Sequence, residues 1–428
     1  MLFRLITYFR LKKGKEDPKR INERFGHTSN EALQKLEEYK QFCRNNNLPV
    51  KVVWLHAVSV GESLSVVNFV QKLSERNYFI VFTTMTKTSA NILENKLPQN
   101  AVHQYKPWQT KKYLTKFLST WKPSFVFFVE SEIFPKTVNV LYKSKIPLYL
   151  INARLSDKSF RMWKIVKFYI KNLLKKYSYI FPLNEEEANK FKILSNNQVK
   201  IKCCGNLKFD TAIINKNAIE ELFNKDSSPD ITKCKLIKKI SENKKKIIVF
   251  GSIHETEFFY ILCQYAMLLK KLDCIGIFVP RYIEQSNILE NKAINSNFNP
   301  IYWDKFTDYN SENIIIVNKM NILQKLYKIC DIAVIGGSFV DKIGGHNPLE
   351  SIVFSKPTFI GRYCHKSQNL INELSKNGAI QQTSNLSENI LAFLRNEIEN
   401  QSKLEKNINT FLNKHKNVAN SIINELKL

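Results

Sequence analysis

Carboxylates that could accept a proton follow two apolar segments of the chain. Glu62 comes shortly after the run at 51–55, and Glu130 and Glu132 come directly after the run at 124–129. A carboxylate just past a buried strand is costly unless solvent or a partner compensates its charge, so such positions often belong to a site. Glu62 is a candidate general base, and the other two acids are candidate site residues.

Each of these acids also has a purely structural interpretation. Ser59 and Glu62 have the spacing of a capping box, which alone would stabilise the following helix by about 0.5–2 kcal/mol. At that position the helix dipole lowers the pKa of a carboxyl group, whereas desolvation by a substrate raises it. Glu130 and Glu132 precede Pro135 and could simply mark the start of a helix. The spacing leaves both alternatives open.

Two further segments could bind an anion. Gly251 and Ser252 follow the apolar run at 246–250 and open a predicted helix, where free backbone N–H groups would form a pocket for phosphate or carboxylate. A glycine-serine turn that caps the helix is the alternative. Arg281 follows the run at 273–279 and could hold a phosphate or stack on a base.

A glycine-rich loop comes just before a helix that is predicted to begin near residue 347. Four of the twelve glycines lie within 336–345, which is more backbone freedom than a helix cap requires. Asn347, Pro348 and Glu350 have the types expected at an N-cap, a first turn and an N3 position. His346 has no partner ligands at useful spacing, so we do not expect it to bind a metal.

Short apolar runs alternate with helical patterns along most of the chain. The first series of predicted strands is at 51–55, 78–83, 124–129, 146–151 and 178–182. The second series is at 246–250, 273–279, 314–317, 331–335 and 357–360. Continuous apolar strands separated by helices predict parallel sheets covered on both faces, and two series predict two doubly wound α/β lobes.

The polar segment between the two series places a domain boundary near residue 210. We expect an amphipathic N-terminal segment at 1–24, a first lobe at 25–210 and a second lobe at 211–428. Ligands of such folds bind beyond the carboxyl ends of the strands, so we expect the site in the cleft between the lobes.

The first residues combine apolar and basic side chains at helical spacing. Leu2, Leu5, Ile6 and Phe9 would share one face, and cations interrupt and follow them. This pattern predicts a helix in the headgroup region of an anionic membrane, and the alternative is a helix packed on its own domain. An interrupted apolar run is not typical of a cleaved signal.

Overall composition limits the classes of function. Of 428 residues, 44% are hydrophobic, and no run approaches the ~18 apolar residues of a spanning helix. A net charge of +27 favours polyanionic partners such as nucleic acid, anionic lipid or phosphorylated substrates. Eight cysteines without a Cys-x-x-Cys pair indicate buried thiols in a reducing compartment, the cytoplasm.

Taken in order, several segments resemble the 3-deoxy-D-manno-octulosonic acid (Kdo) transferases of lipopolysaccharide assembly. The matching segments are RFG (24–26), WLHAVSVGES (54–63), VESEIFP (129–135), INARLSDKS (151–159), GNLKFD (205–210), GSIHETE (251–257), VPR (279–281) and GGHNPLES (344–351). The resemblance implies a GT-B glycosyltransferase fold of two Rossmann-like lobes. It implies transfer of Kdo from CMP-Kdo to a phosphorylated lipid A precursor of the lipid IVA type, with inversion and without a metal or other cofactor.

The same resemblance assigns roles to individual residues. Glu62 matches the proton acceptor, and one of Glu130 or Glu132, together with Lys208, matches positions that stabilise the transition state. The positions that match contacts to CMP are Pro280, Arg281, Asn347, Pro348, Leu349 and Glu350, with Glu350 expected on the ribose hydroxyls. Gly251 and Ser252 are expected to add to this donor site. The segment 318–323 departs from the family pattern, so we expect Asn321 to contact CMP only through its backbone.

The resemblance also implies a location, the cytoplasmic side of the inner membrane, reached peripherally or through a short N-terminal anchor. A related possibility is a GT-B transferase or sugar-nucleotide epimerase that uses another nucleotide, such as UDP. A nucleic-acid-binding protein is not expected despite the charge of +27, because we find no arginine-rich tract and no basic motif interleaved with aromatic residues.

Overall fold

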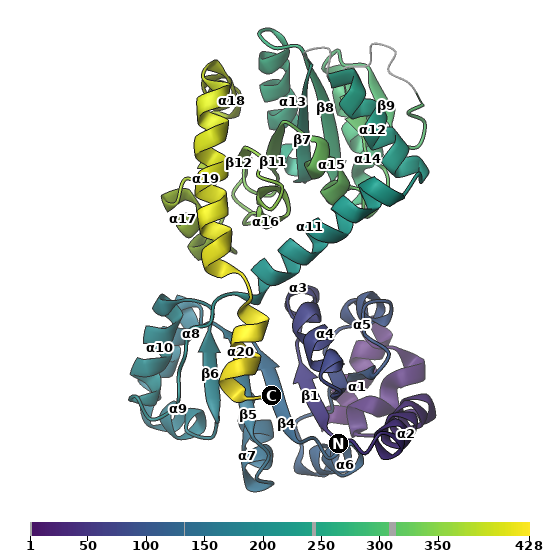
Figure 1. Ribbon diagram of the computed structural model, residues 1–428, viewed down its shortest axis with the longest axis vertical. Helices are drawn as coiled ribbons and strands as arrows, with labels where there is room; N and C mark the ends of the chain where they lie inside the picture. The colour runs from purple at the N-terminus through teal and green to yellow at the C-terminus, as the bar shows by residue number, and fades with distance from the viewer. Residues whose placement is uncertain (1, 132, 242–244, 308–313) are drawn as a thin grey trace. The chain divides into compact units, whose positions relative to one another are not determined.

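The computed structural model describes residues 2–131, 133–241, 245–307 and 314–428 (Figure 1). The chain divides into two compact units, Met1–Thr211 with Asn417–Leu428, and Ala212–Lys416. The last residues were expected in the second lobe, and this expectation is wrong. Val418, Ala419, Ile422 and Ile423 of the C-terminal helix are buried in the core of the first unit, and apolar burial of this kind decides where a helix packs.

A parallel sheet forms the centre of the first unit, with the order β3-β2-β1-β4-β5-β6 over the described residues. Its strands are β1 (Val52–His56), β2 (Phe79–Thr84), β3 (Ala101–Tyr105), β4 (Phe125–Val129), β5 (Leu148–Ala153) and β6 (Tyr179–Pro182). Side chains pointing to opposite faces of these strands fall into two separate apolar cores. The sheet is therefore buried on both faces, as continuous apolar strands predict.

Helices cover both faces of this sheet. They are α1 (Leu2–Lys12), η1 (Pro18–Phe25), α2 (Asn30–Asn45), α3 (Val60–Ser65), α4 (Val67–Glu75), α5 (Lys87–Glu94), α6 (Lys111–Trp121), α7 (Pro135–Lys143), α8 (Asp157–Ile165), α9 (Lys167–Leu174), α10 (Glu185–Ser195) and α20 (Val418–Leu426). Helix α11 (Leu207–Lys225) begins in the first unit and ends in the second.

The second unit contains another parallel sheet, with the order β13-β12-β11-β7-β8-β10-β9 over the described residues. Its strands are β7 (Lys246–Ile253), β8 (Cys274–Pro280), β9 (Pro300–Tyr302), β10 (Ile314–Ile316), β11 (Ile332–Ile335), β12 (Thr358–Ile360) and β13 (Gln381–Gln382). Its helices are α12 (Pro229–Ser241), α13 (Glu255–Leu269), η2 (Ile283–Gln285), α14 (Ser286–Asn295), α15 (Leu323–Ile329), α16 (Leu349–Ile352), α17 (Gln368–Lys376), α18 (Leu386–Arg395) and α19 (Glu397–His415).

These two sheets confirm the predicted α/β class with two doubly wound lobes, and each strand predicted from an apolar run is present. Over the described residues, every helix falls short of the length and apolar character needed to cross a membrane.

Candidate functional site

The carboxyl ends of three neighbouring strands bring the candidate residues of the first unit together. β1 pairs with β4 and β4 pairs with β5, all in parallel, so their carboxyl ends lie along one edge of the sheet. Glu62 lies in α3, the first helix after β1, and Glu130 directly follows β4. Glu130 has a left-handed backbone (φ 62°), which turns the chain sharply at the end of the strand.

Glu62 is a helix-capping residue with an elevated pKa. Its backbone N–H donates to Ser59 Oγ over 3.3 Å, and its carboxylate accepts from Val58 N–H (2.7 Å) and Ser59 Oγ–H (2.9 Å). The serine half of the predicted capping box is thus confirmed, whereas the Glu62 carboxylate bonds to Val58 N–H and to the Ser59 hydroxyl. Burial raises the pKa of Glu62 and the nearby charge of Glu130 raises it further, against the hydrogen bonds that lower it. The cap fixes the carboxylate and leaves lone pairs on both oxygens for a third partner.

Glu130 holds two cations at the same edge. Its side chain is buried, and Oε2 accepts from Arg154 Nε (2.7 Å) and Nη2 (2.6 Å), while Oε1 lies 3.4 Å from Lys208 Nζ. The Arg154 and Lys208 side chains remain 45% and 32% exposed. The buried carboxylate therefore orients two positive groups whose remaining donors face solvent. Glu132, the alternative to Glu130, lies outside the described residues.

Arg154 is a candidate site residue that the sequence reasoning missed. It directly follows β5 within the segment INARLSDKS, and it is one of only eleven arginines. The signal in the sequence that could have identified it is the use of arginine at this position, because lysine is the usual cation of this chain. The preceding Asn152 has φ 53° and its Oδ1 accepts from Leu207 N–H over 3.1 Å. That bond fixes the start of α11, the helix that carries Lys208.

Buried polar atoms without a partner gather at this edge. Over the described residues they include His56 Nε2, Ser63 Oγ and Asn152 Nδ2. His56 Nδ1 lies 2.9 Å from the Thr83 carbonyl oxygen, so Nδ1 carries the hydrogen and Nε2 is an acceptor. Burial holds the pKa of His56 well below its usual value. Orphaned buried groups are rare in folded proteins, and their grouping here is typical of a site that binds water or a ligand.

Gly61 leaves open space beside Glu62. A Cβ added at this residue would meet nothing within 4 Å, and its backbone is not in the left-handed region. Neither packing nor conformation requires glycine here, although glycine weakens a helix. The residue therefore provides a surface without a side chain next to the candidate base.

In the second unit, Gly251 and Ser252 lie inside β7 rather than in a turn after it, which corrects the predicted position. Ser252 has φ 56° at a shift in the strand register. A Cβ at Gly251 would lie 2.0 Å from Tyr327 Oη, so close packing explains the glycine. The proposed contact of these two residues with an anion stays a prediction.

Two backbone N–H groups of the glycine turn after β11 also have hydrogen-bond acceptors within the protein. Glu257 in α13 is fully buried, and its carboxylate accepts from Gly337 N–H (2.6 Å), Phe339 N–H (2.9 Å) and His254 N–H (3.1 Å). These N–H groups are the ones that a Gly-rich turn would otherwise offer to a phosphate. Gly344 is glycine because of its left-handed backbone, with φ 91°.

Two histidines form a hydrogen-bonded pair beside the predicted donor residues. His254 Nε2 and His346 Nε2 are 2.7 Å apart, and the rings are parallel to within 2° with centroids 5.0 Å apart. The imidazoles thus meet through their Nε2 edges. Burial lowers the pKa of His346 to about 4, and the charges of Arg281 and Lys366 contribute. Burial also lowers the pKa of His254, so both imidazoles favour the neutral form, and they lie in a field of positive charge.

The other predicted donor residues divide into buried and accessible ones. Pro280, Pro348 and Leu349 are buried within the second unit. Asn347 is exposed, and its Oδ1 accepts from Leu349 N–H over 3.2 Å. This bond resembles the predicted cap, although the helix begins at Leu349 and Pro348 precedes it.

Glu350 is half-buried in α16. Burial raises the pKa of its carboxyl group, while a hydrogen bond from Gln324 and the charge of Arg281 act in the opposite direction. In the divergent segment, Asn321 is exposed with φ 63°. Among the described residues, Asn318 Oδ1 is a buried acceptor without a donor. It is a second position that the sequence reasoning did not select.

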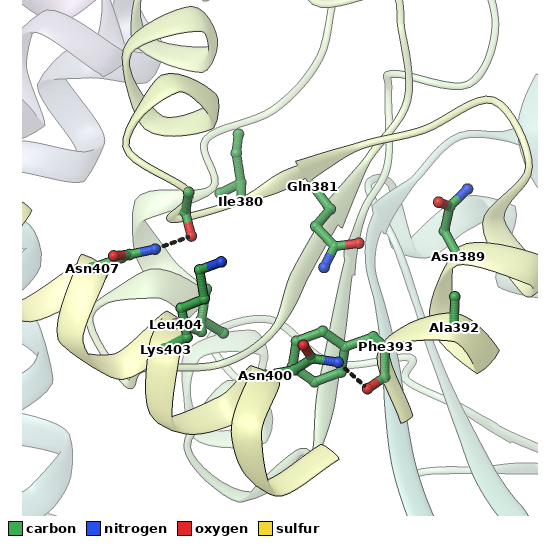
Figure 2. Close-up of a pocket in the computed structure, with 10 residues that line it drawn as sticks. Ile380, Gln381, Asn389, Ala392, Phe393, Asn400, Lys403, Leu404 and Asn407 are labelled. Carbon is green, nitrogen blue, oxygen red and sulfur yellow. Dashed lines mark hydrogen bonds between the residues drawn. The ribbon is translucent and has the colours of Figure 1, made fainter. Parts of the chain in front are cut away.

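No group of three or more His, Cys, Asp or Glu side chains is arranged for a metal within the parts of the chain that the structure describes. The absence of a cofactor therefore stays a prediction. A pocket of about 360 Å³ lies elsewhere in the second unit, between β13, α18 and α19 (Figure 2). Asn400 and Asn407 in its wall donate to backbone carbonyls, and it contains none of the candidate site residues.

Comparison with known proteins relates the chain to one family. A sequence profile of 3-deoxy-D-manno-octulosonic-acid transferases (kdotransferases) matches residues 19–211. A 3-deoxy-D-manno-octulosonic acid transferase of Rickettsia bellii is 33% identical over 84% of this chain and 79% of its own length. The corresponding protein of Rickettsia typhi is 30% identical over 89% of this chain and 86% of its own length.

Similar solved structures support the fold. The UDP-GlcNAc 2-epimerase of Neisseria meningitidis has a TM-score of 0.59 at 15% identity and covers 89% of this chain and 100% of its own. A glycosyltransferase of Rickettsia africae has a TM-score of 0.55 at 14% identity, with coverage of 88% and 97%. Both likenesses are to the two-lobed GT-B type of fold. The chain is a glycosyltransferase that belongs to the 3-deoxy-D-manno-octulosonic acid transferase family.

Proposed function

We propose that the protein transfers Kdo from CMP-Kdo to a phosphorylated lipid A precursor of the lipid IVA type during lipopolysaccharide synthesis. The observation that supports this most directly is the cluster of Glu62, Glu130, Arg154 and Lys208 at one edge of the first sheet. It combines a proton acceptor with an elevated pKa and two oriented cations, which suits the joining of two anionic substrates.

In the proposed reaction, the Glu62 carboxylate accepts the proton of the attacking acceptor hydroxyl. The oxygen of that hydroxyl forms a bond to the anomeric carbon of Kdo. The bond from this carbon to the phosphate oxygen breaks at the same time, and its electron pair leaves with CMP. Because the nucleophile attacks the face opposite the leaving group, the anomeric configuration is inverted. A carboxyl with a raised pKa is a stronger base while it remains ionised at neutral pH.

Arg154 and Lys208 are proposed to face the negative charges of the substrates. Glu130 has both oxygens engaged by these cations, so it acts as a positioning residue rather than as a base. The guanidinium keeps Nη1 for a planar anion such as the carboxylate of Kdo or a phosphate of the acceptor.

The second unit is proposed to hold CMP. Arg281, Lys366 and the His254–His346 pair offer positive charge and polar hydrogens to its phosphate, and Glu350 accepts hydrogen bonds from the ribose hydroxyls. Side chains thus supply the positive charge that a metal would otherwise provide, so we propose that no metal is required. The proposed place of action is the cytoplasmic face of the inner membrane.

The test is a transfer assay with purified protein, CMP-Kdo and a bisphosphorylated tetraacyl lipid A precursor, with and without a metal chelator. We expect a product heavier by one or more Kdo units, unaffected by the chelator. We also expect CMP to raise the melting temperature more than UDP does. Stabilisation by UDP alone together with no Kdo transfer would contradict the proposal and favour a UDP-sugar enzyme, whereas tight salt-dependent binding of nucleic acid without transfer would contradict both.

A further inference from the structure

Helices α8 and α9 carry large apolar side chains on their outer surface. Ile165 and Phe168 are 84% and 82% exposed, and Met162, Val166 and Tyr169 are also exposed. Together these five residues form a surface that we call the α8–α9 face. Contiguous apolar surface of this kind is rare on isolated soluble proteins and marks a site of interaction.

This face is separate from the surface by which the two helices pack on their own unit. Ile170, Leu173 and Leu174 are buried in the core, and Phe160 and Trp163 pack against it from α8. The core contact is therefore complete without the outer residues. The two helices are apolar on an inner side and on an outer side, and a helix with that property needs a second apolar environment.

Positive charge surrounds the α8–α9 face. The basic residues from 158 to 175 are Lys158, Arg161, Lys164, Lys167, Lys171 and Lys175. The one acid of α8 and α9 is Asp157, the first residue of α8, which forms an ion pair with Lys190. Within the described residues, none of these six cations forms an ion pair with the protein. An apolar strip between unpaired cations matches the interface of an anionic bilayer, where apolar side chains enter the acyl region and cations contact phosphates.

The position of the face in the chain connects it to the site. Arg154 lies three residues before α8 begins, a span of at most about 10 Å of extended chain. A lipid substrate held in the bilayer beneath this face would present its headgroup next to Arg154. Figure 1 shows α8 and α9 beside β6, whereas α1 lies on the other side of β1.

Helix α1, the predicted membrane segment, differs from this face. It packs on its own unit, because Phe3 stacks on Trp108 at 5.4 Å and Trp108 Nε1–H donates to Thr7 Oγ1. Leu5 and Phe9 remain about half exposed, at 53% each. Both interpretations of α1 made from the sequence are thus supported, and Leu5 and Phe9 are less exposed than Ile165 and Phe168.

We propose that the α8–α9 face is the main surface by which the protein docks on an anionic bilayer, with Ile165 and Phe168 as its most deeply inserted residues. Docking itself does not depend on the proposed function. The delivery of the acceptor to Arg154 does rest on it.

The test compares the full-length protein and three variants for binding to vesicles of phosphatidylethanolamine with phosphatidylglycerol. I165D/F168D should bind at least tenfold more weakly, because two apolar anchors are replaced by charges that the anionic surface repels. The matched control is Ile398→Asp, since Ile398 is 90% exposed on α19 in the second unit, and it should bind like the unaltered protein. L5D/F9D should reduce binding less than I165D/F168D does. Stabilisation by CMP checks that each variant is folded.

Several results would overturn the inference. One is unchanged vesicle binding by I165D/F168D, and another is an equal loss in I398D. A third is a dimer of the unaltered protein that I165D/F168D converts to a monomer without altering vesicle binding, because the face would then join two copies. Loss of vesicle binding with Kdo transfer intact on acceptor in detergent supports docking, whereas vesicle binding without any Kdo transfer contradicts the proposed function and leaves docking in place.

Discussion

Glu62 and Glu257 occupy equivalent places in the two units and have different surroundings. Each lies near the start of the first helix after the first strand of its sheet, and each accepts from backbone N–H before that helix. Glu257 is fully buried and accepts three backbone N–H groups. Glu62 is half-buried, accepts one backbone N–H and one hydroxyl, and has open space beside it at Gly61.

The comparison shows that capping geometry does not separate a structural acid from a candidate catalytic one. What separates them is how far the carboxylate is satisfied by the fold. Glu257 closes a glycine turn, whereas Glu62 keeps unused lone pairs near Glu130 and orphaned polar atoms. Five predictions test this distinction and the candidate sites around the two acids.

Glu62→Gln should have the largest effect on turnover, lowering kcat by about 10²–10⁴-fold because the general base is lost. Its melting temperature at pH 7 should be equal or higher, since a carboxyl whose pKa is raised on folding destabilises the fold when ionised. Turnover and thermal unfolding are measured on the same preparation. A large loss of stability with wild-type turnover would make Glu62 a cap and nothing more.

Glu257→Gln should show the reverse of Glu62→Gln, namely a clear loss of stability with little effect on turnover. A neutral amide cannot satisfy three N–H donors, so we expect a loss of about 2–3 kcal/mol in unfolding free energy. Denaturant unfolding measures that loss. The comparison fails if this variant is as stable as the unaltered protein yet inactive.

Arg154→Ala should lower kcat/KM by about tenfold or more through loss of a charge-assisted contact. Arg154→Lys should recover only part of the activity, because an ammonium cannot make the two bonds that the guanidinium makes to Glu130. Arg76→Ala, which removes an exposed arginine bonded to Lys72 O, is the control. Equal kinetics for the alanine variants at 154 and 76 would exclude Arg154 from the site.

CMP should bind more tightly as pH falls from 8 to 6. The pKa of His346 is about 4 without ligand, and an added phosphate raises it, so binding takes up a proton. The groups facing the pair are Arg281 and Lys366, which oppose that proton, and the Tyr282 ring, which packs on His254. Calorimetry in two buffers of different ionisation enthalpy measures the uptake. H346N should abolish it, and a pH-independent affinity would remove the pair from the donor site.

Gly61→Ala should give the smallest effect on the fold, a gain of about 0.5–1 kcal/mol, because alanine is the better helix former and nothing lies in its way. Its kcat/KM should fall a few-fold if a substrate occupies the open surface. A gain in stability without any kinetic change would show that the space is unused.

Fold class was predictable from the sequence because buried parallel strands are continuous apolar runs. Three strands were not predicted from the sequence: β3 (Ala101–Tyr105), β9 (Pro300–Tyr302) and β13 (Gln381–Gln382). Each lies at the edge of its sheet, where a strand has only one neighbour and does not need apolar side chains throughout. The packing of α20 on the first unit could not be predicted either, because its apolar stripe indicates that the helix is buried on one side but not which unit it packs against.

Site prediction had a similar limit. Glu62 and its cap could be found because their spacing is local. Arg154 binds Glu130 across 24 residues, and Glu257 binds the turn at 337–339 across 80. Contacts between residues so far apart in the chain depend on the order of the strands in the sheet, and the apolar periodicity of the sequence does not determine that order. The family resemblance supplied Lys208 without its link to Glu130.

Because α20 completes the apolar core of the first unit, the half of the protein that is made first lacks a component until residues 418–426 have been synthesised. That part of its core stays uncovered while the whole second unit is being synthesised. A stop codon at position 417 should therefore damage the half of the protein encoded first, and expression of residues 1–211 alone should yield an aggregation-prone fragment unless a peptide of residues 417–428 is supplied in trans.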